Sequence, residues 1–126
     1  MKIHSTLALI SMASALALPA IPASATPAPV GAWRVANGNA VIDIRPCGEN
    51  LCGYVASDTS SDSFVGQQVF IDMRPEGDDW SGTIVDLKNG QRYAGKISLL
   101  DDKKLNVEGC IMGGFFCGGQ QWSRVE

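Results

Sequence analysis

Apolar and polar side chains alternate in short runs after Gly31, and clusters of Gly, Asn and Asp separate these runs. This alternation is typical of half-buried β-strands, and no stretch keeps helical apolar spacing for more than one turn. The pattern predicts strands at 31–36, 40–46, 51–57, 67–73, 80–87, 91–100, 104–111 and 116–126. The chain should therefore belong to the all-β class.

Two turns predict the register of the later hairpins. Asn89-Gly90 suits a two-residue turn, because both central residues of a type I′ turn need positive φ. This turn would pair Asp86 with Tyr93, Ile84 with Gly95, Gly82 with Ile97 and Trp80 with Leu99, and a three-residue turn at 101–103 would pair Leu99 with Leu105 and Ile97 with Val107. The apolar residues of both hairpins then share one face, with glycines where curved strands approach. We expect a small eight-stranded up-and-down antiparallel β-barrel.

The first 25 residues have the composition of a secretory signal peptide. One lysine precedes an apolar stretch from Leu7 to Leu18, and Ala23-Ser24-Ala25 supplies the small residues of a cleavage site. A membrane anchor is the weaker interpretation, because a helix needs roughly 20 apolar residues to span a bilayer. We expect residues 1–25 to be removed, 26–30 to form a flexible lead-in, and 31–126 to form one β-barrel domain in the periplasm or outside the cell, with no membrane span.

Composition excludes several kinds of chemistry once the leader is removed. The only histidine is His4, so the remaining chain has no Ser/His/Asp or Cys/His nucleophile and no histidine-bearing metal site. Nine Lys and Arg side chains against thirteen Asp and Glu leave a net charge of −4. A negative chain disfavours binding to the phosphate backbone of nucleic acids. We expect no enzymatic activity, no cofactor, no metal and no nucleic-acid partner.

Four cysteines in an exported chain indicate two disulfides. Three connectivities are possible, and the hairpins favour one of them. A turn at 48–51 would place Cys47 opposite Cys52 and Arg45 opposite Tyr54, whereas a loop at 111–116 would place Cys110 opposite Cys117 and Leu105 opposite Trp122. A redox site is the weaker interpretation, because the C-x4-C spacing lies on a hairpin and not at a helix N-terminus. A zinc site is also weaker, because both hairpin tips would have to converge.

Aromatic residues are placed to close the barrel. Trp33 lies on the inner face of the first predicted strand, and Trp122 and Arg124 share the inner face of the last. These two strands must be neighbours in a closed barrel. We therefore expect the Arg124 guanidinium to lie over the Trp33 indole at the seam, shielding it from water.

Five motifs in order carry a family resemblance. They are Gly31-Ala32-Trp33, CGENLCGYV at 47–55, Trp80-Ser81-Gly82, the Asp86, Gly90 and Tyr93 pattern, and Gln120-x-Trp122-x-Arg124. Over about residues 30–126 the chain resembles the domain of unknown function 2147 (DUF2147) family of small exported bacterial proteins. The resemblance implies a lipocalin-like β-barrel in the periplasm or outside the cell, and it implies no established activity. The chain is much shorter than a typical lipocalin, which argues against a roomy pocket.

Asp86 and Tyr93 are the candidate polar groups of a ligand site at one barrel mouth, with Trp80, Ile84 and Leu99 as its apolar wall. Alternatively, Tyr93 or backbone amides of the turn satisfy Asp86, and the pair locks the hairpin. The acidic pairs at 78–79 and 101–102 lie at turns and lack a calcium-loop pattern. The inward aromatic side chains are expected to fill much of the barrel and leave a shallow mouth.

Three functions remain open from the sequence. The first is a non-enzymatic binding or carrier module for a small, partly apolar molecule, which rests on analogy of fold. The second is a structural or protein-interaction barrel of the cell envelope with a filled core, acting through its outer surface or through Phe115 and Phe116. The third is an enzyme that uses Asp86, which the absence of histidine disfavours.

Overall fold

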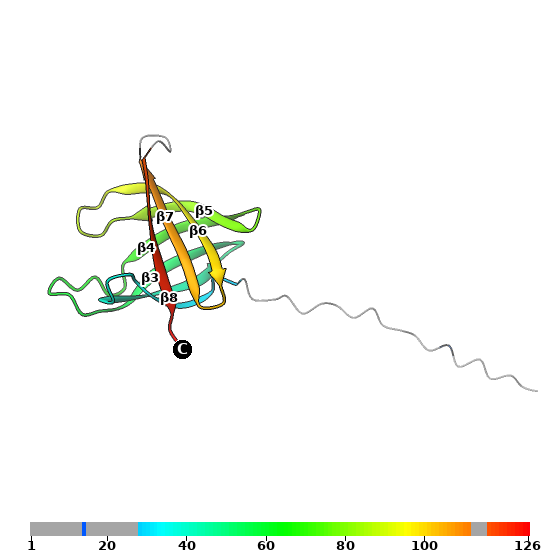
Figure 1. The fold of residues 1–126 in the computed structure, drawn as a ribbon, viewed down its shortest axis with the longest axis horizontal. Helices are drawn as coiled ribbons and strands as arrows, with labels where there is room; N and C mark the ends of the chain where they lie inside the picture. Colours follow the sequence, from blue (N-terminus) through cyan, green and yellow to red (C-terminus); the bar gives the residue numbers. More distant parts are fainter. Residues whose placement is uncertain (1–13, 15–27, 112–115) are drawn as a thin grey trace, which may run out of the picture.

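The computed structural model describes residue 14, residues 28–111 and residues 116–126. Phe115 and the predicted signal peptide, except for Ser14, lie outside these described residues. The described residues form eight strands, namely β1 (Gly31–Arg34), β2 (Ala40–Cys47), β3 (Asn50–Asp58), β4 (Gln68–Glu76), β5 (Asp79–Val85), β6 (Arg92–Asp101), β7 (Lys104–Ile111) and β8 (Phe116–Arg124) (Figure 1). Each strand pairs antiparallel with the next and β8 pairs with β1, so the sheet is a closed barrel. This confirms the predicted all-β, eight-stranded antiparallel barrel.

The predicted register is confirmed for the last two hairpins. Leu99 pairs with Leu105 and Ile97 with Val107 between β6 and β7, although the turn itself is two residues long and a bulge precedes it. Leu105 pairs with Trp122 between β7 and β8. Apolar residues facing one interior therefore set the alignment of these strands.

The predicted register of two earlier hairpins is wrong by two residues. Between β5 and β6, Ile84 pairs with Tyr93 and Trp80 with Ile97, because the loop spans residues 86–91 and is not a two-residue turn. Between β2 and β3, Arg45 pairs with Cys52, because the turn contains only Gly48 and Glu49. A shift of two residues keeps each side chain on its predicted face, so the barrel interior is unaffected.

A β-bulge in β4 explains why the apolar run at 64–73 shows no clear alternation. Asp72 has a φ of 47°, and the pairing of β4 with β5 shifts between Ile71 and Arg74. Phe70 and Met73 are both fully buried, although a separation of three positions would place them on opposite faces of a regular strand. The extra residue of the bulge allows both side chains to reach the interior.

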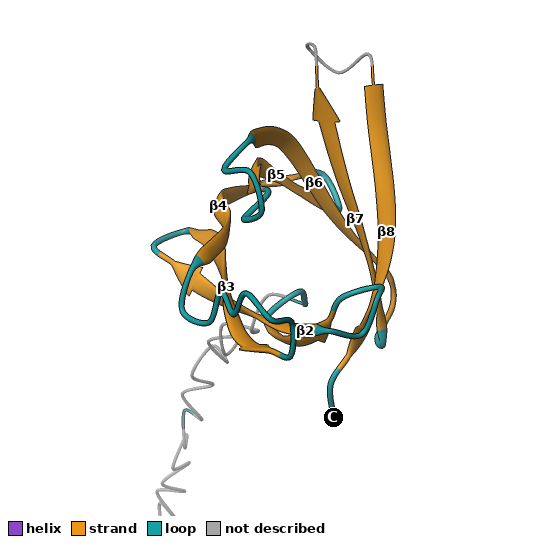
Figure 2. Ribbon diagram, turned by 90° about the vertical axis from the view of Figure 1, so that its left-hand side faces the viewer, coloured by secondary structure: helices purple, strands orange, loops and turns teal. Residues whose placement is uncertain are grey.

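The two ends of the barrel differ in their connections. At one end, which we call the closed end, two-residue turns join β2 to β3, β4 to β5 and β6 to β7. Gly48 and Gly77 begin the first two turns with φ of 66° and 60°, a conformation in which glycine has no steric penalty. At the opposite, open end, longer loops at 35–39, 59–67 and 86–91 join the strands, which Figure 2 shows arranged as a ring.

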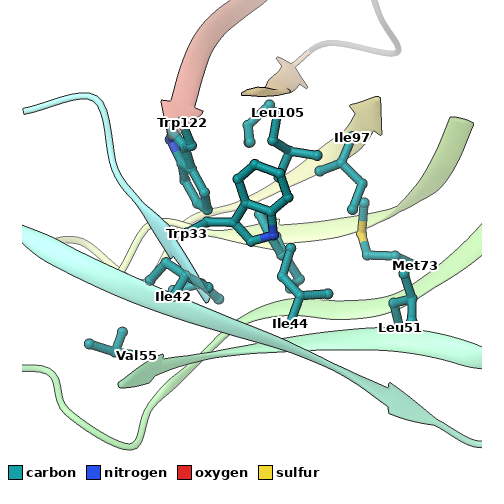
Figure 3. Close-up of a cluster of buried hydrophobic side chains, with 12 residues drawn as sticks. Trp33, Ile42, Ile44, Leu51, Val55, Met73, Ile97, Leu105 and Trp122 are labelled. Atoms are coloured by element: carbon teal, nitrogen blue, oxygen red, sulfur yellow. The ribbon is translucent and has the colours of Figure 1, made fainter. Parts of the chain in front are cut away.

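The hydrophobic core fills the closed half of the barrel. Trp33 is fully buried at its centre and is surrounded by aliphatic side chains from several strands (Figure 3). The largest fully buried side chains are Trp33, Ile44, Leu51, Phe70, Met73, Ile97 and Leu105. Phe70 stacks on Trp122 with ring centroids 5.3 Å apart. Within the described part of the chain, no helix is both long and apolar enough to cross a membrane.

Arg124 closes the seam between the first and last strands. Only two residue pairs join β1 to β8, namely Trp33 with Arg124 and Arg34 with Ser123. The Arg124 guanidinium lies 4.3 Å from the centre of the Trp33 ring, which is the arrangement expected from the sequence. It also donates hydrogen bonds of 2.7–3.0 Å to the carbonyl oxygens of Ala28, Val30 and Asp102. The side chain therefore joins three segments of the chain.

Residues 28–30 of the predicted lead-in contact the barrel. Trp33 Nε1 donates a hydrogen bond of 2.9 Å to the carbonyl oxygen of Pro29. The carbonyl oxygens on either side of Pro29 accept from Arg124. The folded unit therefore includes these residues, which precede β1.

Both predicted disulfides are confirmed. Cys47 is bonded to Cys52 across the β2–β3 turn, and Cys110 is bonded to Cys117 across the β7–β8 hairpin. Cys110 and Cys117 are directly opposite each other, as expected, whereas Cys47 is diagonal to Cys52 because of the shifted register. Each bridge joins residues close in sequence, so it fixes one hairpin locally and does not hold distant parts together.

Candidate functional site

A cavity of about 430 Å³ occupies the open half of the barrel. Its walls are mainly apolar side chains of the inner barrel face, including Ile42, Val55, Val69, Phe70, Ile84, Val107 and Trp122. The volume lies in the range of small-molecule sites, which is roughly 300–1,000 Å³. The expectation of only a shallow mouth is therefore wrong, because Trp33 and Trp80 pack in the closed half and leave the other half open.

Polar side chains surround the mouth of this cavity. The charged ones are Asp58 at the end of β3 and Asp86 and Lys88 in the β5–β6 loop. Uncharged polar side chains of the lining come from the β1–β2 loop, the β3–β4 loop, β6 and β8, and they are Asn37, Asn39, Ser60, Tyr93 and Gln120. An apolar interior with a polar mouth can hold a molecule that has an apolar body and a polar end.

Asp58 organises the β3–β4 loop beside the mouth. Its Oδ1 accepts hydrogen bonds from the hydroxyl and the backbone N–H of Ser60, and its Oδ2 accepts from the backbone N–H of Phe64 at 3.2 Å. The Ser60 hydroxyl is the main cause that lowers the pKa of Asp58 below 3.8, and the nearby Lys88 charge contributes to the same shift. The carboxylate is therefore ionised at neutral pH and holds Phe64 at the cavity wall.

Asp86 and Tyr93 both line the cavity, but they do not form the predicted pair. Asp86 Oδ1 accepts a hydrogen bond of 2.9 Å from the backbone N–H of Lys88, so the carboxylate stabilises its own loop. Tyr93 pairs with Ile84 on the neighbouring strand, and no hydrogen bond joins these two described residues, Asp86 and Tyr93. The turn amide thus satisfies one carboxylate oxygen, and this part of the locking alternative is present.

The predicted apolar wall is only partly assembled. Ile84 lines the cavity, whereas Trp80 and Leu99 are not among its lining residues. Trp80 lies six positions before Asp86, which is about 20 Å along a strand at ~3.3 Å per residue. Leu99 lies at the closed end, where it borders a depression beside Arg124. The five predicted residues share the inner face but lie at different heights along the barrel, so a shared face was not sufficient to place them in one site.

Several cavity residues were not identified from the sequence. Phe64, Val69 and Phe70 belong to the apolar run whose faces the bulge obscured. Asp58 and Ser60 belong to a serine-rich stretch that looks like an ordinary solvated loop. An aspartate two residues before a serine can form an Asx turn, in which the carboxylate accepts a hydrogen bond from the backbone N–H two residues later. The Asp58-Thr59-Ser60 sequence is such a signal and could have indicated that this loop is ordered.

Two clusters combine cysteine sulfur with a carboxylate. Asp72 lies near the Cys47–Cys52 bridge, and Glu108 lies near the Cys110–Cys117 bridge. In both clusters the sulfurs are bonded to each other. They are therefore not thiolate ligands in this state, and neither cluster has the four thiolates of the zinc alternative.

Comparison with known families gives nearly the same region as the sequence resemblance. Residues 31–124 match the family described as an uncharacterized protein conserved in bacteria (DUF2147). The chain belongs to the DUF2147 family. This match covers the whole barrel, from β1 to the end of β8. No curated protein matches the sequence.

One solved structure shows that this DUF2147 barrel is lipocalin-like. Protein HP1028 of the human pathogen Helicobacter pylori, described as belonging to the lipocalin family, superposes with a TM-score of 0.63. The two chains are 11% identical, and the alignment covers 77% of this chain and 82% of HP1028. At this identity the similarity shows the shared fold alone.

Proposed function

We propose that the chain is a non-enzymatic module that binds or carries a small, partly apolar molecule inside its barrel. The observation that carries this proposal is the apolar cavity of about 430 Å³, open among polar side chains at one end. The lipocalin-like fold supports it, because such barrels can enclose one small ligand. The same cavity counts against the alternative of a structural barrel with a filled core.

Export of the chain to the periplasm or the cell exterior is part of this proposal. Two disulfides join all four cysteines, and disulfides persist in oxidising compartments. The signal-like sequence at residues 1–25 supports the same location. A binding role in that compartment needs no catalytic group, in keeping with a barrel sequence that contains no histidine.

A variant that fills the cavity tests the proposal directly. Gly118 lines the cavity, and a Cβ built on it meets no atom within 4 Å. A larger side chain at this position should therefore enter the cavity without disturbing the strand. We expect Gly118→Leu to weaken binding of N-phenyl-1-naphthylamine, a neutral apolar dye, by at least tenfold in a fluorescence titration.

The adjacent glycine provides a matched control. Gly119 does not line the cavity, and a Cβ there makes ordinary contacts of 3.7 Å with Asn106 Oδ1 and the carbonyl oxygen of Val107. Gly119→Leu should bind the dye as the unmodified chain does. Equal dye affinity in the two variants, or no dye binding by the unmodified chain, would contradict a ligand site in the barrel.

A further inference from the structure

The charged groups at the cavity mouth are unequal in sign and in exposure. Two carboxylates, Asp58 and Asp86, and one ammonium, Lys88, are the charged side chains that line the cavity among the described residues. Both carboxylate residues are half-buried, whereas Lys88 is exposed. Solvent screens an exposed charge more than a half-buried one, so the carboxylates dominate the electrostatic potential at the mouth.

The hydrogen bonds of the two carboxylates differ. Both oxygens of Asp58 accept hydrogen bonds from its own loop. Asp58 therefore adds negative charge at the mouth, but both of its oxygens already have donors. Asp86 uses Oδ1 for the backbone N–H of Lys88, and within the described residues Oδ2 has no hydrogen-bond donor. Asp86 Oδ2 is therefore available to an N–H donor carried by a ligand.

Among the described residues, the other polar side chains that line the cavity add no compensating positive charge. Asn37, Asn39 and Gln120 are uncharged, and the Gln120 Oε1 already accepts a hydrogen bond of 3.0 Å from Trp122 Nε1. The three charged groups sum to −1. An anionic head group at this mouth would meet net repulsion, whereas a cationic head group would meet net attraction and a free acceptor.

We propose that the barrel selects amphiphiles with a protonated amine head, which binds at Asp86 while the apolar tail occupies the cavity. This inference rests on the proposed function and specifies the ligand class of the same site. In water, one unit charge about 4 Å from a charged head group changes the affinity for that ligand by roughly fivefold. The effect is favourable for a cation and unfavourable for an anion, so it enters twice when the two ligands are compared. We expect a preference of about tenfold or more.

Three probes with the same tail measure this preference. Decylamine, decanol and decanoate are titrated below their aggregation concentrations at neutral pH and low salt, each as a competitor of N-phenyl-1-naphthylamine. Decylamine should bind about tenfold more tightly than decanoate, with decanol between them. Added salt should reduce the difference, because it screens the mouth charges.

Two variants separate a local effect from the net charge of the molecule. Asp86→Asn keeps an oxygen for the Lys88 N–H and should reduce the amine preference to about threefold or less. Asp78→Asn removes the same charge at an exposed turn of the closed end, away from the cavity, and should leave the preference unchanged. Lys88→Gln should increase the preference, because it removes the opposing charge.

The outcomes distinguish the inference from the function on which it rests. Decanoate binding as tightly as decylamine, or an equal loss of preference in Asp86→Asn and Asp78→Asn, overturns the amine inference and leaves the binding function standing. If the dye and all three probes fail to bind, the proposed function itself is wrong.

Discussion

Removal of the Arg124 side chain should destabilise the barrel by about 3 kcal/mol. The guanidinium lies over the fully buried Trp33 ring, a cation–π contact worth roughly 1 kcal/mol when it is partly shielded from water. It also donates three hydrogen bonds to backbone carbonyls, and we count about 0.7 kcal/mol for each, below the usual value for charged donors, because two of the acceptors belong to exposed residues. Arg124→Ala loses all four interactions.

The measurement is urea unfolding at neutral pH with the disulfides intact, followed by tryptophan fluorescence. Arg34→Ala is the matched control. Arg34 follows Trp33 on β1, is exposed, and makes one long hydrogen bond of 3.4 Å to the carbonyl oxygen of Gly38. The Arg34→Ala variant should change the free energy of unfolding by less than about 0.5 kcal/mol. Arg124→Lys should recover only part of the loss, because an ammonium cannot reproduce the planar arrangement of donors. Equal losses in Arg124→Ala and Arg34→Ala would refute the seam as a source of stability.

Three further predictions follow from the same structure. Gly95→Ala should lower the free energy of unfolding by about 1–3 kcal/mol, because its Cβ would overlap Ile84 Cγ1, whereas Gly118→Ala should be nearly neutral; similar urea midpoints would contradict this packing. Ser60→Ala should raise the pKa of Asp58 toward 3.8 in an NMR titration, because the Ser60 hydroxyl is the main cause of the lowered value. In the unmodified chain the stabilisation that the Asp58 carboxylate gives to the β3–β4 loop is complete above pH 3.8 and is lost as the pH falls through the lowered pKa. An Asp58 carboxyl that titrates at 3.8 in the unmodified chain would contradict these loop hydrogen bonds. Non-reducing peptide mapping should recover Cys47 linked to Cys52 and Cys110 linked to Cys117, and any peptide linking the two hairpins would contradict both bridges.

Period-two alternation was sufficient to predict the barrel and the order of its strands. The inner positions of Leu99, Leu105 and Trp122 agree across three strands, and this agreement leaves one alignment in which all three side chains pack with the core. The arginine over Trp33 was also predictable, since a closed barrel requires its first and last strands to meet. These features depend on which face a residue occupies, and alternation reports that directly.

Turn length and height in the barrel were harder to predict. Asn89-Gly90 suggested a tight turn, but Asp86 and Asn89 each accept a backbone N–H two residues later and stabilise a longer loop. That shift separated Asp86 from Tyr93. The cavity depends further on where Trp33 and Trp80 pack and on the bulge at Asp72, which are results of packing between distant residues and have no local sequence signal.

The short seam between β1 and β8 has a consequence for how the chain acquires its structure. Arg124 bonds to the carbonyl oxygen of Ala28, 96 positions earlier, and β1 contributes only four residues to the barrel. In a chain synthesised from its N-terminus, β1 can pair with β2 early, but its other edge has no partner until β8 has been made. Contacts of such long sequence separation form slowly, and an open sheet edge can pair with other chains in the meantime. Trp33 therefore loses its contact with water only when β8 docks, so the last strand of the barrel completes the core that the first strand began.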